Sequence, residues 1–126
     1  MTREEAVDAL EKAVVGAAMR VMNALGPGLN EKCYENALVV ELRACGHRVD
    51  QQRQFDVFYR GTKVGVLIPD LIVDDSLVVD PKTVEKLGNN EVAQMITYLA
   101  VTGLSRALLI NFNRRRLEWR KVHPKA

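Results

Sequence analysis

Hydrophobic residues recur every three to four positions in the first part of the chain, the spacing that places them on one face of an α-helix. The pattern predicts one helix over residues 2–25, with a capping box at its start, and a second over residues 31–45, capped by Asn30. Gly26-Pro27-Gly28 lies between them, and glycine and proline interrupt helices. We therefore expect two helices joined by a tight corner.

After His47 the pattern changes to alternating apolar and polar residues, which is typical of β-strands. Further along, the helical spacing returns once between two more strand-like segments. The predicted elements are, in order, strands at residues 49–59, 66–73 and 77–80, a helix at residues 88–103, and strands at residues 107–112 and 117–122. The order α-α-β-β-β-α-β-β indicates an α/β (α+β) fold, in which the late helix crosses over to bring the next strand into the sheet.

Two aspartates and a lysine interrupt the apolar strands of the predicted hairpin, at Asp70, Asp80 and Lys82. If the hairpin loop is the three residues 74–76, counting outward places Asp70 directly opposite Asp80. Opposite Cβ atoms lie ~5 Å apart, and a residue two positions further along points the same way, so Lys82 would join them. A two-residue loop would send Asp80 to the other face of the sheet, so the register tests this grouping.

Two carboxylates beside one ammonium group suit metal-dependent cleavage of phosphodiesters. Oxygen ligands favour a hard cation such as Mg²⁺. A cation held there lowers the pKa of a bound water and stabilises the extra negative charge of the transition state, while Lys82 orients that water or holds the phosphate. The alternative is a simple Asp80–Lys82 pair that holds the hairpin, because short patterns of acids and lysine recur by chance.

Two further groups of polar residues lie on the predicted helices. Glu31 and Glu35 share one helical face, where a solvated edge is the simpler interpretation unless the helix packs beside the sheet. Gln94 and Tyr98 lie one turn apart on the later helix. They would contact a phosphate, a base or the lysine, or else form hydrogen bonds within the core.

The composition, 48% hydrophobic and 27% charged over 126 residues, predicts one globular domain spanning residues 1–126. The net charge of +2 is too small to identify a nucleic-acid binder, so affinity for phosphate must come from local clusters. Such a cluster stands at Arg114, Arg115 and Arg116, in the turn expected between the last two strands. These arginines would contact phosphates or only keep the turn soluble.

The two cysteines also bear on location. Cys33 and Cys45 are twelve positions apart on one predicted helix, a separation of ~18 Å that excludes a disulfide between them. Unpaired cysteines and the lack of a signal peptide predict a cytoplasmic protein. No apolar run approaches the ~20 residues that a membrane span requires, so a soluble chain is expected.

The chain resembles the GxxExxY proteins of the PD-(D/E)XK nuclease superfamily over nearly its whole length. The name motif stands as Gly28-Leu-Asn-Glu31-Lys-Cys-Tyr34. Further similar blocks are Val84-Glu85-Lys86-Leu87, Ala93-Gln94, Tyr98-Leu99, Thr102-Gly103-Leu104, Leu109-Ile110-Asn111-Phe112 and Leu117-Glu118-Trp119.

This resemblance implies a restriction-endonuclease-like core, a mixed sheet flanked by helices, and cleavage of nucleic acid, with DNA as the expected partner and Mg²⁺ or Mn²⁺ as the cofactor. Asp70, Asp80 and Lys82 match the catalytic positions of the superfamily. A helix glutamate, Glu31 or Glu35, would assist, with Glu35 as a third metal ligand. Gln94 and Tyr98 resemble the Gln-x-x-x-Tyr element of the RecB-like branch, so they are candidates for contact with the substrate.

The sequence also departs from its relatives. Where they commonly read Glu-Leu-Lys-Ala, this chain reads Asp80-Pro81-Lys82-Thr83, and Pro81 removes a backbone donor from the strand. Arg20 and Met22 stand where relatives carry an acid and a histidine. Besides a metal-dependent nuclease, the sequence is therefore compatible with an inactive module of the same fold that binds nucleic acid or protein, with a homodimer as one possible form.

Overall fold

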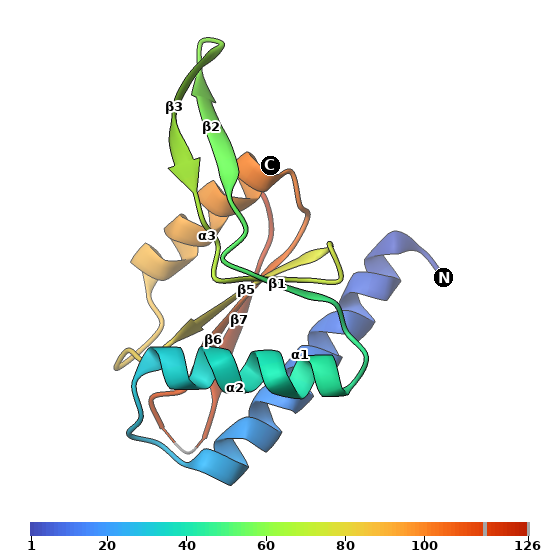
Figure 1. Ribbon diagram of the computed structural model, residues 1–126, viewed down its shortest axis with the longest axis vertical. Helices are drawn as coiled ribbons and strands as arrows, with labels where there is room; N and C mark the ends of the chain where they lie inside the picture. The colour runs from blue at the N-terminus through green and yellow to red at the C-terminus, as the bar shows by residue number, and fades with distance from the viewer. Residues whose placement is uncertain (115, 126) are drawn as a thin grey trace.

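The computed structural model describes residues 1–114 and 116–125 and combines three helices with two β-sheets (Figure 1). The elements are α1 (Arg3–Leu25), α2 (Glu31–Ala44), β1 (Val49–Gln51), β2 (Phe55–Tyr59), β3 (Thr62–Leu67), β4 (Leu71–Val73), β5 (Leu77–Lys82), α3 (Asn89–Thr102), β6 (Ala107–Asn111) and β7 (Glu118–Val122). The larger sheet has the strand order β1-β4-β5-β6-β7, and β2 pairs only with β3. The predicted α+β class is confirmed.

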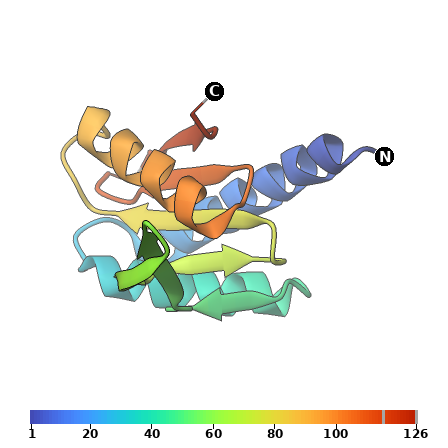
Figure 2. The same ribbon diagram turned by 90° about the horizontal axis from the view of Figure 1, so that it is seen from above.

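The larger sheet is mixed, because one of its strand pairs is parallel. β5 and β6 run parallel and are joined by α3, whereas β1–β4, β4–β5 and β6–β7 are antiparallel. This agrees with the crossover expected from the sequence. Helices α1 and α2 cover one face of the sheet and α3 covers the other (Figure 2). Side chains of successive strand residues therefore enter different cores, so each residue of β5 faces either α1 and α2 or α3.

Local capping explains the helix ends. Thr2 and Glu5 form the expected capping box on α1, and the Asn30 side chain accepts a hydrogen bond from the backbone N–H of Cys33 at the start of α2. α3 ends at Gly103, whose φ of 76° is the left-handed conformation that glycine adopts without strain. All three helices agree with the prediction to within about two residues at each end.

Tyr34, the last residue of the GxxExxY motif, fixes the corner between α1 and α2. Its hydroxyl donates to the carbonyl of Gly26 at 2.6 Å and accepts from the N–H of Leu29 at 3.1 Å. Its ring stacks on Phe112 at a centroid distance of 4.9 Å. The buried tyrosine thus satisfies two backbone groups of the corner and ties it to the end of β6.

The prediction of three strands between α2 and α3 was wrong, since the structure has five. The expected strand at residues 49–59 breaks after Gln51, because Gln52 adopts a φ of 62° that turns the chain out of the sheet. The expected strand at residues 66–73 breaks at Pro69, which lacks the N–H that a continuous strand would need. The residues between these breaks form β2 and β3, which project from the body of the molecule (Figure 1).

Within residues 1–114 and 116–125, none of the helices combines the length and the apolar character needed to cross a membrane.

Candidate active site

The β4–β5 hairpin has the three-residue loop that the sequence analysis required. Val73 pairs with Leu77, and the register continues through Leu71 opposite Val79. Asp70 directly precedes β4, so this register, extended by one residue, brings Asp70 opposite Asp80, and its carboxyl lies close enough to raise the pKa of Asp80. Both aspartates therefore lie on the face of the sheet that α3 covers, which is also the face of Lys82.

Asp80 is a buried carboxylate with an incomplete set of partners. Its side chain is 3% exposed and its Oδ2 lies 3.3 Å from Lys82 Nζ. Its Oδ1 is buried without a hydrogen-bond partner among the described residues. Burial, followed by a hydrogen bond with the Asp70 carboxyl, raises the pKa of Asp80 to about 8. In the absence of a cation, Asp80 therefore retains its proton at neutral pH.

Lys82 connects the aspartates to α3. Its Nζ donates to Gln94 Oε1 at 3.1 Å, and Gln94 Nε2 in turn donates to the Tyr98 hydroxyl at 3.2 Å. Burial lowers the pKa of Lys82, but attraction by Asp80, Glu31 and Asp70 outweighs burial and raises it above its ordinary value. Lys82 is therefore an ammonium donor at neutral pH and not a proton acceptor.

Tyr98 is half-buried and packs against the apolar cluster under α3. Burial and the nearby charges of Asp80 and Asp70 raise the pKa of its phenol. The structure thus brings Gln94 and Tyr98 together with Lys82, as a line of hydrogen bonds leading away from Asp80.

Glu35 is buried beside the sheet, so the interpretation of the glutamate pair as a solvated helix edge was wrong. The side chain of Glu35 is 4% exposed. Its Oε2 accepts hydrogen bonds from three donors, Lys32 Nζ at 2.9 Å, Gln51 Nε2 at 2.6 Å and Gln52 Nε2 at 3.3 Å. These bonds compensate the cost of burying a charge.

Gln52 links Glu35 to the aspartates. Its Nε2 lies 3.3 Å from Glu35 Oε2 and 3.5 Å from Asp70 Oδ1, and its backbone N–H donates to the carbonyl of Asp70 at 3.1 Å. The sequence analysis did not identify Gln52. Its place in the site depends on the left-handed backbone that ends β1, and no sequence pattern indicated that conformation.

Glu31 lies at the other end of the cluster. Its Oε1 accepts from the backbone N–H of Thr83 at 3.2 Å, directly after β5 ends. Glu31 therefore holds the segment that follows Lys82.

The predicted three-ligand set of Asp70, Asp80 and Glu35 does not form a closed cluster. Nowhere in the described part of the chain do three acidic, histidine or cysteine side chains converge as metal ligands. Glu35 instead uses its Oε2 to accept hydrogen bonds from three donors. Asp70 and Asp80 alone still fit a cation, because a buried oxygen without a partner faces a second carboxylate and Mg²⁺ is commonly held by one or two carboxylates and water.

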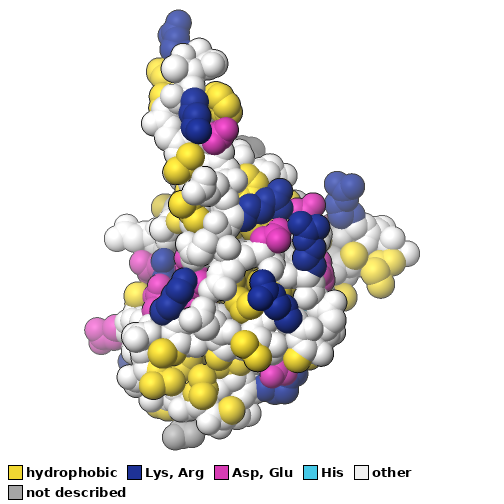
Figure 3. All heavy atoms as spheres, in the orientation of Figure 1, with side chains coloured by type: hydrophobic (Ala, Val, Ile, Leu, Met, Phe, Trp, Pro, Cys, Tyr) yellow, Lys and Arg dark blue, Asp and Glu magenta, His cyan; other side chains and the backbone are white. Residues whose placement is uncertain are grey.

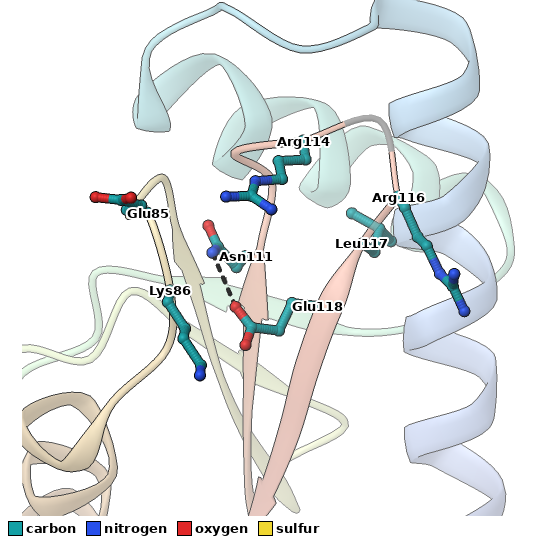
Figure 4. Close-up of a pocket in the computed structure, with 7 residues that line it drawn as sticks. All are labelled: Glu85, Lys86, Asn111, Arg114, Arg116, Leu117 and Glu118. Carbon is teal, nitrogen blue, oxygen red and sulfur yellow. Dashed lines mark hydrogen bonds between the residues drawn. The ribbon is translucent and has the colours of Figure 1, made fainter.

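The arginine turn lies at a different place. Arg114 and Arg116 line a cavity of about 850 Å³ at the carboxyl ends of β5 and β6 (Figure 4). Of the described residues, the lining comprises Glu85, Lys86, Asn111, Arg114, Arg116, Leu117 and Glu118, and it includes none of the Asp70, Asp80 and Lys82 cluster. Arg115 lies outside the described residues. The three arginines therefore stay a prediction for contact with phosphate.

Asn111 and Glu118 form the rigid wall of this cavity. Asn111 Nδ2 donates to Glu118 Oε1 at 3.1 Å (Figure 4). The same two side chains bond the backbone of Val84 and Leu87. The segment between Lys82 and α3 is thereby held in place on β6 and β7.

Comparison with known proteins identifies the family. The fold is similar to two crystal structures of an alkaline exonuclease, LHK-Exo, from Laribacter hongkongensis, one of them in complex with dAMP. Each match has 14% sequence identity and a TM-score of 0.50, and covers 86% of this chain and 76% of the exonuclease. No curated protein sequence matches the chain. A sequence model described as the PD-(D/E)XK nuclease superfamily matches residues 8–122. Because that match spans most of the chain, this protein belongs to the PD-(D/E)XK nuclease superfamily.

Proposed function

We propose that this protein is a metal-dependent nuclease whose reaction centre consists of Asp70, Asp80 and Lys82. The observation that carries the proposal is the hairpin register, which sets Asp70 opposite Asp80 and leaves a buried Asp80 oxygen without a partner beside the Lys82 ammonium. Desolvating a carboxylate in this way is costly unless it serves a ligand.

Asp70 and Asp80 would hold Mg²⁺ or Mn²⁺, the ions that suit a pair of carboxylate ligands. Such an ion, when bound, lowers the pKa of a coordinated water and stabilises the negative charge that develops on the phosphate. Lys82 keeps its proton and donates to the scissile phosphate or to the attacking water.

The surrounding side chains keep these three groups in position. Gln94 orients Lys82 through a bond of 3.1 Å, and Tyr98 holds Gln94. Gln52 connects Asp70 to Glu35, which is itself fixed by Lys32. Positioning of this kind matters because small displacements of catalytic groups cost large factors in rate.

Separate observations support the proposed substrate, the proposed subfamily and the proposed location of the protein. The complex of the similar exonuclease with dAMP supports nucleic acid, and DNA in particular, as the substrate. The corner built around Tyr34 supports membership of the GxxExxY group, and the Gln94–Tyr98 hydrogen bond supports the RecB-like branch. Cys33 and Cys45 are free thiols, which suits the reducing cytoplasm.

Cleavage of labelled single- and double-stranded DNA and RNA in Mg²⁺ or Mn²⁺ tests the proposal. Asp80→Asn keeps the shape of the side chain and removes its charge, so we expect turnover to fall by about 10³-fold or more, or about 4 kcal/mol of transition-state stabilisation. The matched control is Glu4→Gln, which neutralises an exposed acid at the start of α1 and should retain activity within about twofold. Equal cleavage by Asp80→Asn and wild type, purified identically, would show that the site is wrong or that the activity is a contaminant.

A further inference from the structure

The two-stranded sheet of β2 and β3, hereafter the arm, is the most exposed part of the molecule and rises directly from the candidate site. It projects beyond the layers formed by the larger sheet and the helices (Figure 1). The chain enters the arm after Gln52 and leaves it before Asp70, and these two residues are joined by a backbone hydrogen bond of 3.1 Å. Any ligand lying along the arm would therefore reach Asp70.

One face of the arm is anchored to the body. Phe55 packs against the apolar cluster under α3, and the Arg53 guanidinium lies 4.9 Å from the centre of the Phe55 ring. Leu67 pairs with Phe55 on the same face and is half-buried. The base of the arm is thus fixed in direction relative to the site.

The other face is uncovered, and it combines the apolar side chains of Phe58 and Val66 with the Asp56–Lys63 ion pair. Phe58 and Val66, which share this face with Asp56, are 62% and 47% exposed. Tyr59, at the end of β2, points to the opposite face near the tip of the arm and is 68% exposed. Two-stranded sheets are marginally stable alone, and large apolar side chains grouped on a projecting element mark a surface that receives a ligand.

The charges of the arm select among possible ligands. Residues 53–68 contain the three basic residues Arg53, Arg60 and Lys63 and a single acid, Asp56. Lys63 lies 3.2 Å from Asp56 and offsets its charge. Arg53, at the base of the arm, is paired with Asp75 at 2.7 Å and with Asp50 at 3.3 Å. Arg60 at the tip has no acidic partner among the described residues, so the tip of the arm is positively charged. The space-filling view shows basic side chains and apolar side chains interleaved along the arm (Figure 3).

We propose that the arm binds an unpaired strand of nucleic acid and guides it to the Asp70–Asp80–Lys82 site. Phe58 or Tyr59 stacks on a base, while Arg60 and Lys63 contact the phosphates on either side. Exposed aromatic rings interleaved with basic residues are the usual means of binding single strands, and in a duplex the base faces are already stacked on one another. This inference rests on the proposed nuclease function and specifies its substrate as a single strand or an unpaired end.

Binding measured without cleavage tests the arm separately from catalysis. We would follow the fluorescence anisotropy of a labelled oligothymidylate, and of a blunt duplex of equal length, with EDTA present to prevent turnover. For Phe58→Ala or Tyr59→Ala we expect the dissociation constant for the single strand to rise at least about fivefold, the effect of losing one stacked base. For Arg60→Gln we expect the slope of log affinity against log salt to shrink by about 0.7, corresponding to one lost phosphate contact on a single strand.

Two control variants remove the same groups elsewhere. Trp119→Ala removes an exposed ring from β7, and Arg3→Gln removes an exposed charge from the start of α1. Both should bind as wild type does. Because Phe58, Tyr59 and Arg60 are exposed, their replacement should leave the melting temperature of the protein nearly unchanged, which circular dichroism would verify.

Each outcome bears on one proposal or the other. The inference is overturned if wild type prefers the duplex or binds neither probe, or if both arm ring variants bind the single strand as wild type does. It is also overturned if Phe58→Ala converts a dimer to a monomer in light scattering without weakening the single-strand complex, because the arm would then cover a second copy. If binding follows the arm but wild type cleaves nothing, the inference stands and the proposed nuclease function fails.

Discussion

The burial of the Asp80 carboxylate lowers the stability of this fold. A carboxylate that is almost fully buried, with one oxygen lacking a partner, costs more to desolvate than its neighbouring lysine returns. Asp70 adds a like charge across the hairpin and makes the cost larger. Groups in such positions commonly serve ligand binding or chemistry, where the desolvated charge is used.

This cost gives the metal-free protein a characteristic pH dependence. The pKa of Asp80 is raised to about 8 in the folded state, above its ordinary value of 3.8, so the folded state binds the proton more tightly than the unfolded chain. The stabilisation is complete below about pH 4 and is lost as the pH rises through about 8. In EDTA, we expect the free energy of unfolding to fall between pH 5 and 9 by on the order of a few kcal/mol more in wild type than in Asp80→Asn. Urea denaturation at a series of pH values would measure this, and parallel curves for the two proteins would contradict it.

Among single residues, the sequence predicted those whose positions follow from counting along a strand. Asp70, Asp80 and Lys82 follow from the period of a strand and the length of one loop, and the register confirms that they share a face. The sequence analysis missed Gln52, because its own left-handed backbone conformation, directly after the short strand β1, brings its side chain to Asp70. The burial of Glu35 depends on which strand ends lie beside α2, and the pattern within one helix does not contain that information.

At the scale of elements, Pro81 in β5 is the feature that most suggests an inactive site, because proline lacks the N–H of a regular strand residue. Its position in β5 shows that no such N–H is needed there. The N–H of Val78 donates to Arg106, and the carbonyl of Lys82 accepts from Phe112. Alternate residues of a strand bond to the same neighbour, so residues 78, 80 and 82 bond to β6 and Pro81 points the other way. On that side β4 has already ended at Leu71, opposite Val79. No hydrogen bond of the sheet is lost to the proline.

We therefore expect Pro81→Ala to cleave nucleic acid within about twofold of wild type, because neither Asp80 nor Lys82 moves. The variant should be less stable by about 0.4–1 kcal/mol, since proline reduces the freedom of the unfolded chain. Chemical denaturation and a cleavage assay on the same preparation would test both statements. A large gain of activity in Pro81→Ala would instead show that the proline impairs the site.

The helices were predicted more closely than the strands for a physical reason. The ends of α1 and α2 are set by residues within one turn, such as Thr2 and Asn30, so local sequence specifies them. The ends of β1 and β4 depend on where a partner strand is present, which is a property of the whole sheet. Residues 49–59 were predicted as one strand, yet residues 50–54 are all polar and the two ends of the range belong to different sheets.

At the scale of the whole molecule, the candidate site brings together side chains from the helices on both faces of the sheet. Glu31 and Glu35 come from α2 on one face of the sheet, and Gln94 and Tyr98 come from α3 on the other. Both sets reach the same end of the β4–β5 hairpin. Local opening of any one layer would therefore disturb Asp70, Asp80 or Lys82, which couples the site to the integrity of the fold.

This coupling predicts that a divalent ion stabilises the entire molecule. An ion that binds only the folded state at ten times its dissociation constant adds about 1.4 kcal/mol to the free energy of unfolding. For a chain of 126 residues we expect a rise in melting temperature of about 5 °C with Mg²⁺ or Mn²⁺. The rise should be larger at pH 9 than at pH 6, because Asp80 must lose its proton to bind the ion.

Asp70→Ala should abolish this stabilisation, whereas Glu4→Ala, which removes an exposed carboxylate at the start of α1, should preserve it. Calorimetry with and without the ion would compare the three proteins. An equal rise in wild type and Asp70→Ala would place the ion elsewhere on the surface. If the melting temperature does not rise at millimolar Mg²⁺ and Mn²⁺, no ion compensates the free-energy cost of burying the Asp80 carboxylate. That result would favour a member of the superfamily that keeps the fold and binds without cleaving.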